Sequence, residues 1–120
     1  MKSNDSIVSR FCAAFGRMNA DELIEYFTPD ATYHNIPLPP LRGRAEIYES
    51  LKGLPLRFKG LQIETLNQVS AGSLVLNERV DYFLFEDRRV ALPIAGVIEM
   101  EAGKIKAWRE YFDLATLKNG

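Results

Sequence analysis

The chain has 120 residues and a formal net charge of −1, from 15 basic and 16 acidic side chains. That length suits one domain over residues 1–120 with a single core. The balanced charge gives no reason to expect nucleic acid or an anionic membrane as a partner. The opening segment is polar and no stretch approaches the roughly 20 apolar residues of a membrane span, so we expect a cytoplasmic protein.

The counts of reactive residue types exclude several kinds of site. Cys12 is the only cysteine and His34 the only histidine. An intrachain disulfide and a zinc site built from several Cys or His ligands are therefore excluded. There is no G-x-S-x-G motif and no glycine-rich nucleotide motif. We expect no metal and no cofactor, and we expect any catalysis to use Asp, Glu, Tyr, Lys and Arg.

The first half of the chain has helical patterns interrupted by one short strand. Apolar residues recur at helical spacing from Ile7 to Met18. Asp21 is the predicted N-cap of a second helix, which ends at residues 28–30. Residues 31–36 are a predicted strand, followed by a proline-rich loop. A third helix is predicted over residues 43–54 and ends at Pro55.

The second half changes to strand patterns. The predicted strands cover residues 57–69, 74–85, 89–100 and 104–113. Their links are short, which favours antiparallel neighbours. Helices followed by a meander of strands predict an α+β domain, with the helices packed on one face of the sheet.

Three polar clusters occur where core residues are expected. In a strand, alternate side chains share a face, so Tyr33 and Asn35 lie together while His34 points away. By the same rule Asn77, Arg79 and Asp81 share a face. Apolar residues follow on both faces of this strand, which predicts that the Arg79 and Asp81 side chains are buried. The third cluster is Trp108-Arg-Glu-Tyr-Phe-Asp113.

A buried arginine beside an aspartate is costly, because desolvation of each ion costs several kcal/mol. Arg79 could contact two carboxylates and give them different proton affinities. One carboxylate would stay ionised as a base and the other could carry a proton as an acid. The alternative without a catalytic role is a structural ion pair that links neighbouring strands.

Together, Tyr33-x-Asn35, Arg79-x-Asp81 and Trp108-Arg-x-Tyr-Phe-Asp113 resemble the limonene-1,2-epoxide hydrolase family over most of the chain. The resemblance implies a cone-shaped fold of the nuclear-transport-factor-2-like type, with a strongly curved, mixed and mostly antiparallel sheet. It also implies a homodimer through the open sheet face. The chain departs from the limonene enzyme in lacking that enzyme's longer N-terminal segment.

The resemblance also implies a role for each matching residue. Asp113 looks like the general base that takes a proton from water, and Tyr33 and Asn35 like the residues that hold this water. Asp81 looks like the general acid, with Arg79 between the two aspartates. The implied reaction is a one-step addition of water to an apolar, cyclic or terpenoid-like epoxide, giving a vicinal diol. No metal or cofactor takes part.

Simpler interpretations apply to several of these residues. Asp113 could be the N-cap of residues 114–118. Trp108 differs in strand parity from Asp113, which favours a core position unless a bulge intervenes. Most apolar residues that could line a pocket are core residues in other proteins. The predicted pocket residues are Leu38, Phe83, Leu92, Ile94 and Trp108.

Two other functions fit the same fold. A carbon-acid isomerase or polyketide-type cyclase would also use an aspartate base, but it would not need Arg79 between two carboxylates. A non-catalytic small-molecule-binding or dimerisation domain would need neither the aspartate base nor the arginine between two carboxylates. This alternative is open because fold does not fix function.

Overall fold

The fold is shown by a computed structural model that describes residues 3–119. Met1 and Lys2, which begin the polar opening segment, and Gly120 lie outside the described residues. Helix α1 spans Asn4–Phe15, and the Ser3 side chain caps it by accepting a hydrogen bond from the Ser6 amide. Its apolar stripe is buried from Ile7 to Phe15, as the periodicity predicts, but the helix ends before Met18, which has a φ of 52°.

Helix α2 spans Ala20–Ile24 and corrects one prediction. Its N-cap is Asn19, whose side chain accepts from the Glu22 amide, and not Asp21. Asp21 lies in the first turn, where its carboxylate accepts a hydrogen bond from the Tyr48 hydroxyl.

Strand β1, Phe27–Asn35, begins four residues earlier than predicted. The sequence Thr28-Pro29-Asp30 predicts a break, but the strand continues through it. β1 pairs in parallel with strand β6, Lys104–Tyr111, and the register shifts between Phe27 and Thr32. This irregularity accommodates Pro29, which has no amide proton for the ladder.

A short strand β2, Leu41–Arg42, leads into helix α3, Gly43–Lys52. Pro55 does not end this helix. Gly53 ends it, and Pro55 lies at the start of helix α4, Leu54–Arg57, where a proline is tolerated because the first amides of a helix have no partner. The predicted strand over 57–69 therefore starts only at Gly60.

The remaining strands are β3, Gly60–Ala71, β4, Leu74–Leu84, and β5, Arg89–Glu101. The six strands form one sheet in the order β2-β1-β6-β5-β4-β3. Neighbours are antiparallel except β1 and β6, so the predicted meander of four antiparallel strands is confirmed. β6 ends at Tyr111, two residues before the predicted end, and the short helix α5, Leu114–Asn119, follows.

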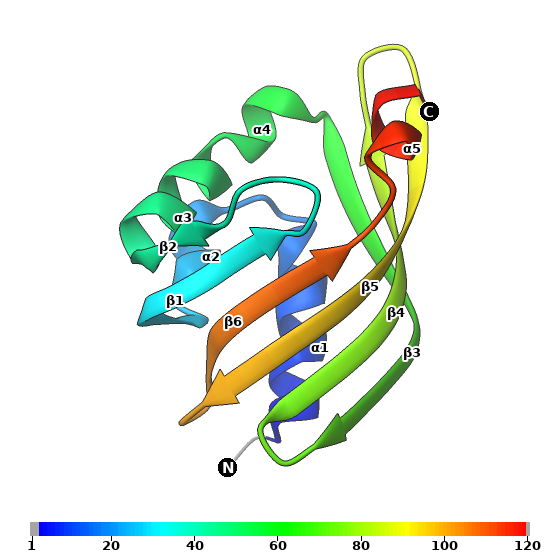
Figure 1. Cartoon of the computed structure of the whole chain (residues 1–120). Coiled ribbons are helices and arrows are strands. Elements are labelled where there is room, and N and C mark those ends of the chain that lie inside the picture. The colour runs from blue at the N-terminus through cyan, green and yellow to red at the C-terminus, as the bar shows by residue number, and fades with distance from the viewer. Residues whose placement is uncertain (1–2, 120) are drawn as a thin grey trace.

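The helices α1 to α3 pack on one side of a curved, open sheet, as Figure 1 shows. The core lies between α1 and the sheet and contains Phe11, Phe27, Ile98 and Trp108. The α+β class with a mixed, mostly antiparallel sheet is therefore confirmed. Within residues 3–119, no helix has the length and apolar character needed to cross a membrane.

Candidate active site

The charged cluster on β4 lies inside the protein. The strand alternates buried and exposed residues, so Asn77, Arg79 and Asp81 all face the core side. The Arg79 side chain has no exposed surface, and that of Asp81 is 7% exposed. The prediction that this pair is buried is confirmed.

All three nitrogens of the Arg79 guanidinium donate hydrogen bonds to side-chain oxygens. Nε donates to Asp81 Oδ1 at 3.2 Å, and Nη2 donates to Asp81 Oδ2 at 2.9 Å. Nη1 donates to Asn77 Oδ1 at 3.1 Å. Nη2 also donates to Glu110 Oε1 at 2.8 Å. The two-point contact with Asp81 is the planar geometry that arginine and carboxylate favour.

The second carboxylate at Arg79 is therefore Glu110, which corrects the prediction of Asp113. Glu110 is 7% exposed, whereas Asp113 is exposed and lies beyond the end of β6. The Asp113 carboxylate accepts a hydrogen bond from the Ala115 amide at 2.9 Å. Asp113 thus stabilises the start of α5, as the simpler interpretation of this residue stated.

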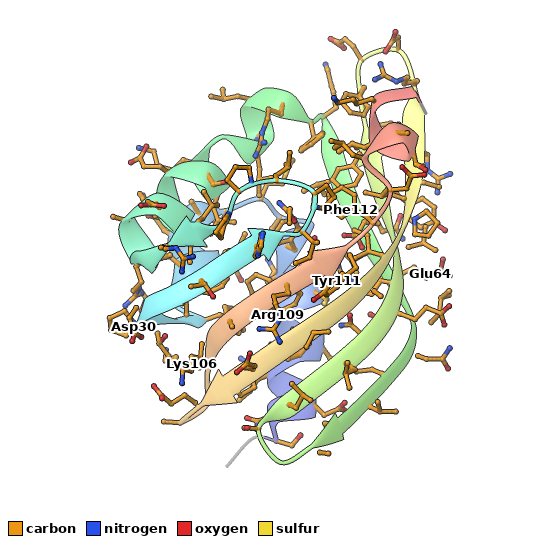
Figure 2. All side chains as sticks on the ribbon, in the orientation of Figure 1. Asp30, Glu64, Lys106, Arg109, Tyr111 and Phe112 are labelled. Carbon is orange, nitrogen blue, oxygen red and sulfur yellow. The ribbon has the colours of Figure 1, made fainter. Side chains whose placement is uncertain are left out.

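Strand parity explains the correction. Trp108 and Glu110 are two residues apart on β6 and both face inward, while Arg109 faces outward and pairs with Glu99. Figure 2 labels Arg109 and Tyr111 on β6, along the face opposite α1. The parity mismatch between Trp108 and Asp113 is the signal in the sequence that could have identified Glu110, although the prediction from it was only a core position for Trp108.

Glu110 has two donors on one oxygen. Trp108 Nε1 donates to Glu110 Oε1 at 2.7 Å, and Arg79 Nη2 contacts the same atom. Neither an indole nor a guanidinium nitrogen can accept a hydrogen bond. Oε1 is therefore fixed as an acceptor, and a proton arriving at Glu110 would bind Oε2.

Strand β1 brings the third cluster to the same place. In the parallel pairing of β1 with β6, Tyr33 lies beside Trp108 and Asn35 lies beside Glu110. The Tyr33 and Trp108 rings are stacked with 4° between their planes. His34 points away and contacts the Leu38 carbonyl, as its parity predicts.

Several polar atoms of these residues face open space. Among the described residues, the Tyr33 hydroxyl, the Asn35 amide and Glu110 Oε2 have no hydrogen-bond partner. Within residues 3–119, no fully buried side-chain nitrogen or oxygen lacks a partner, so these atoms reach the adjoining cavity. They form a group of donors and acceptors that could bind a water molecule.

The cavity beside them has a volume of about 140 Å³. Its polar lining includes Tyr33, Asn35, Asp81 and Glu110 from the sheet, and Ser50 and Arg57 from the helices. The structure also places all five predicted pocket residues on it, with the partly exposed Leu38 among them; these are Leu38, Phe83, Leu92, Ile94 and Trp108. Helices supply further apolar lining that the sequence did not reveal, including Phe15, Ile47, Leu54 and Leu117.

Burial dominates the electrostatics of the cluster. Desolvation raises the pKa of Asp81 to about 6, although Arg79 opposes this shift and Glu110 adds to it. Desolvation also raises the pKa of Tyr33 well above its ordinary value, so its hydroxyl keeps its proton. One guanidinium cannot neutralise two carboxylates, so the charge of Glu110 adds to the rise in the pKa of Asp81.

Gly96 of β5 makes room for the cluster. It lies between Asn77 of β4 and Glu110 of β6 in the sheet register. A Cβ atom at this position would lie 2.5 Å from Asn77 Oδ1 and 2.7 Å from Arg79 Nη1. The Arg79 side chain can reach Glu110 across β5 only because residue 96 has no side chain.

The Cys12 thiol does not belong to this chemistry. It is buried, and desolvation raises its pKa to about 12. Residues 3–119 contain no group of three or more His, Cys, Asp or Glu side chains arranged to hold a metal ion.

Comparisons with known proteins match the whole domain. The family model of the limonene-1,2-epoxide hydrolase catalytic domain matches residues 2–120. Epoxide hydrolase EphG of Mycobacterium tuberculosis is 27% identical over 113 residues, which cover 94% of this chain and 75% of the relative. A solved structure of an M. tuberculosis epoxide hydrolase, described as similar to the limonene enzyme, has a TM-score of 0.86 at 26% identity. The match covers 97% of this chain and 86% of the chain in that structure.

A third comparison concerns the fold alone. A protein of unknown function from Burkholderia pseudomallei, described as nuclear-transport-factor-2-like, has a TM-score of 0.87 at 16% identity. The match covers 99% of this chain and 97% of that one. The predicted nuclear-transport-factor-2-like fold is thereby confirmed.

Replacement of Gly96 tests the packing of the cluster. Gly96→Ala should lower the free energy of unfolding by roughly 1–3 kcal/mol, because the new methyl group collides with Asn77 and Arg79. Urea denaturation measures the change. Gly60→Ala is the matched control on β3, where a Cβ would meet Leu84 at an ordinary 3.5 Å. Equal losses in the two variants would contradict the proposed collision.

The raised pKa of Asp81 predicts a pH-dependent stability. Between pH 3.8 and about 6 the folded protein holds a proton on Asp81 that the unfolded chain releases. This contribution to stability is full below pH 3.8 and is lost as the pH rises through about 6. The unfolding free energy of wild type minus that of Asp81→Asn should fall across this window by an amount on the order of 2–3 kcal/mol.

Urea denaturation at a series of pH values measures this difference. Asp87→Asn is the control, because the Asp87 carboxylate is exposed. The unfolding free energy of wild type minus that of each variant is compared across the pH series. If this difference has the same pH trend for both variants, or rises with pH for Asp81→Asn, Asp81 does not have a raised pKa.

Proposed function

This chain belongs to the limonene-1,2-epoxide hydrolase family, and we propose that it hydrolyses an apolar epoxide to a vicinal diol with Asp81 as acid and Glu110 as base. One observation carries the proposal: a single buried guanidinium contacts both carboxylates, and both carboxyl groups line the same cavity. A base alone would serve a carbon-acid isomerase, so this paired arrangement favours acid–base addition of water.

The proposed reaction is one step. A water molecule held by Tyr33 and Asn35 attacks an epoxide carbon and loses a proton to Glu110 Oε2. The carbon–oxygen bond of the ring breaks, and the departing oxygen takes the proton of Asp81. The proton gained by Glu110 later returns to Asp81, so the net reaction is epoxide plus water to diol.

The physical properties of the site support these roles. The pKa of Asp81, raised by burial to about 6, leaves a usable fraction of the acid protonated near neutral pH. The donors on Glu110 Oε1 fix the orientation of this carboxylate. Alignment of water, base and acid in one cavity, together with the strain of the three-membered ring, supplies the rate acceleration.

The apolar lining supports a hydrophobic substrate, cyclic or terpenoid-like, as the family name implies. The walls contain Phe15, Phe83, Leu92 and Ile94 beside the polar side chains. An apolar ring bound there would exclude bulk water from the carboxylates.

The assignment of the base is tested with Glu110→Gln. With the best substrate of an epoxide panel, the rate of diol formation should fall at least about 100-fold, because the water loses its proton acceptor. Asp113→Asn should stay within about threefold of wild type, since asparagine also caps α5. Gas chromatography of the diol measures both rates.

Two results would contradict this proposal. A folded Asp113→Asn variant as inactive as Glu110→Gln would return the base to Asp113. A single turnover in heavy-oxygen water that yields unlabelled diol would show that the oxygen came from the protein, and the one-step route would be wrong.

We also propose that the protein forms a homodimer through the outer sheet face. Apolar side chains are paired there by the strand register, Leu76 with Val97 and Ala95 with Tyr111. Leu76 and Tyr111 are 40% and 45% exposed in the single chain. Sedimentation should therefore give about twice the 13.6 kDa chain mass, and Val97→Asp should give a folded monomer. A wild-type monomer at micromolar concentration would refute the dimer.

A further inference from the structure

A chain of polar side chains connects Arg79 to helix α1. Arg79 Nη1 donates to Asn77 Oδ1, and Asn77 Nδ2 donates to Gln68 Oε1 at 3.2 Å. Gln68 Nε2 then reaches the first turns of α1. It lies 2.9 Å from Asp5 Oδ1, 3.1 Å from the Asp5 carbonyl and 3.0 Å from Ser9 Oγ. Elements far apart in sequence are thus joined through two amides.

The chemistry at the two ends allows these amides one orientation. Arg79 offers only donors, so Asn77 must present its oxygen to Nη1 and its nitrogen to Gln68. The Asp5 carbonyl and carboxylate offer only acceptors, so Gln68 must present its nitrogen to α1. A reversed Asn77 would place donor against donor at Arg79. Both ends therefore require the same arrangement.

None of these connecting residues touches the cavity. Arg79, Asn77 and Gln68 are absent from its lining, whereas Asp81 and Glu110 belong to it. Asn77 is 6% exposed, and its oxygen lies directly over Gly96. Any influence of Asn77 on the reaction must therefore pass through the guanidinium.

We infer that Asn77, oriented by Gln68 and the first turns of α1, is a positioning residue that holds the Arg79 guanidinium between Asp81 and Glu110. This inference rests on the proposed function for its catalytic consequence. Without the acceptor at Nη1, the guanidinium could turn away from the geometry in which one nitrogen contacts both carboxylates. The acid and the base would then no longer share one cation.

The test uses Asn77→Leu and Gln68→Leu, with Gln62→Leu as the matched control. Gln62 is an exposed residue on the same strand as Gln68, and its replacement removes the same amide without touching the polar chain. In Asn77→Leu, kcat for diol formation should fall about tenfold or more while KM stays within about twofold, since Asn77 does not contact the substrate. Gln68→Leu should lower kcat about threefold, and Gln62→Leu should match wild type.

A second measurement does not depend on the proposed function. The titration midpoint of the Asp81 carboxyl carbon, followed by NMR, should rise by about half a pH unit or more in Asn77→Leu, because a loosely held cation stabilises the carboxylate less. A residue with only a structural role would lower the melting temperature and leave this midpoint unchanged.

The outcomes separate the two proposals. If the wild type hydrolyses no epoxide but the midpoint moves in the Asn77 and Gln68 variants, the proposed function fails and the positioning role stands. If both variants fold and keep both the wild-type kcat and the wild-type midpoint, the positioning role is overturned. If Asn77→Leu does not fold, the kcat and the Asp81 titration midpoint of Gln68→Leu decide in its place.

Discussion

One guanidinium buried between two carboxylates is the constraint on which this structure depends. Desolvation of three charged groups is expensive, and removal of one partner would leave an unpaired ion in the core. The protein compensates with acceptors for all three nitrogens of Arg79, including both oxygens of Asp81. Neighbouring residues maintain the cluster: Gly96 leaves room for the Arg79 side chain, and Trp108 donates a hydrogen bond to Glu110.

The mixed sheet brings the polar side chains of three strands together. Asp81 and Arg79 lie on β4, Glu110 lies on β6, and Tyr33 and Asn35 lie on β1. Only the parallel pairing of β1 with β6 brings Asn35 beside Glu110. A simple antiparallel meander would supply the charged pair without the side chains that face it.

Much of this arrangement could be predicted from local patterns. Alternation along residues 77–81 placed Arg79 and Asp81 on one buried face, and parity correctly turned His34 away from Tyr33 and Asn35. Short links predicted the antiparallel hairpins. At the Ala102-Gly103 turn both residues have positive φ, as the favoured two-residue hairpin requires.

The errors arose where a choice depended on contacts between distant segments. Asp113 fitted the motif by residue type. However, the end of the last strand is set by its pairing with β5, and this pairing stops at Tyr111. Glu110 was present in the quoted motif, and its shared parity with Trp108 could have identified it. The contact between Glu110 and Arg79 across Gly96 could not have been predicted, because it requires the register of three strands.

The division of the cavity wall has an evolutionary consequence. The carboxyl groups of the cavity wall, those of Asp81 and Glu110, lie on strands of the sheet. Much of the apolar lining comes instead from helices and the C-terminal segment. Substitutions at Phe15, Ile47, Leu54 or Leu117 therefore change the shape of the cavity at positions that make no hydrogen bond to the charged cluster. Mutant libraries confined to those positions offer a route to altered cavity shapes in which Arg79, Asp81 and Glu110 are kept.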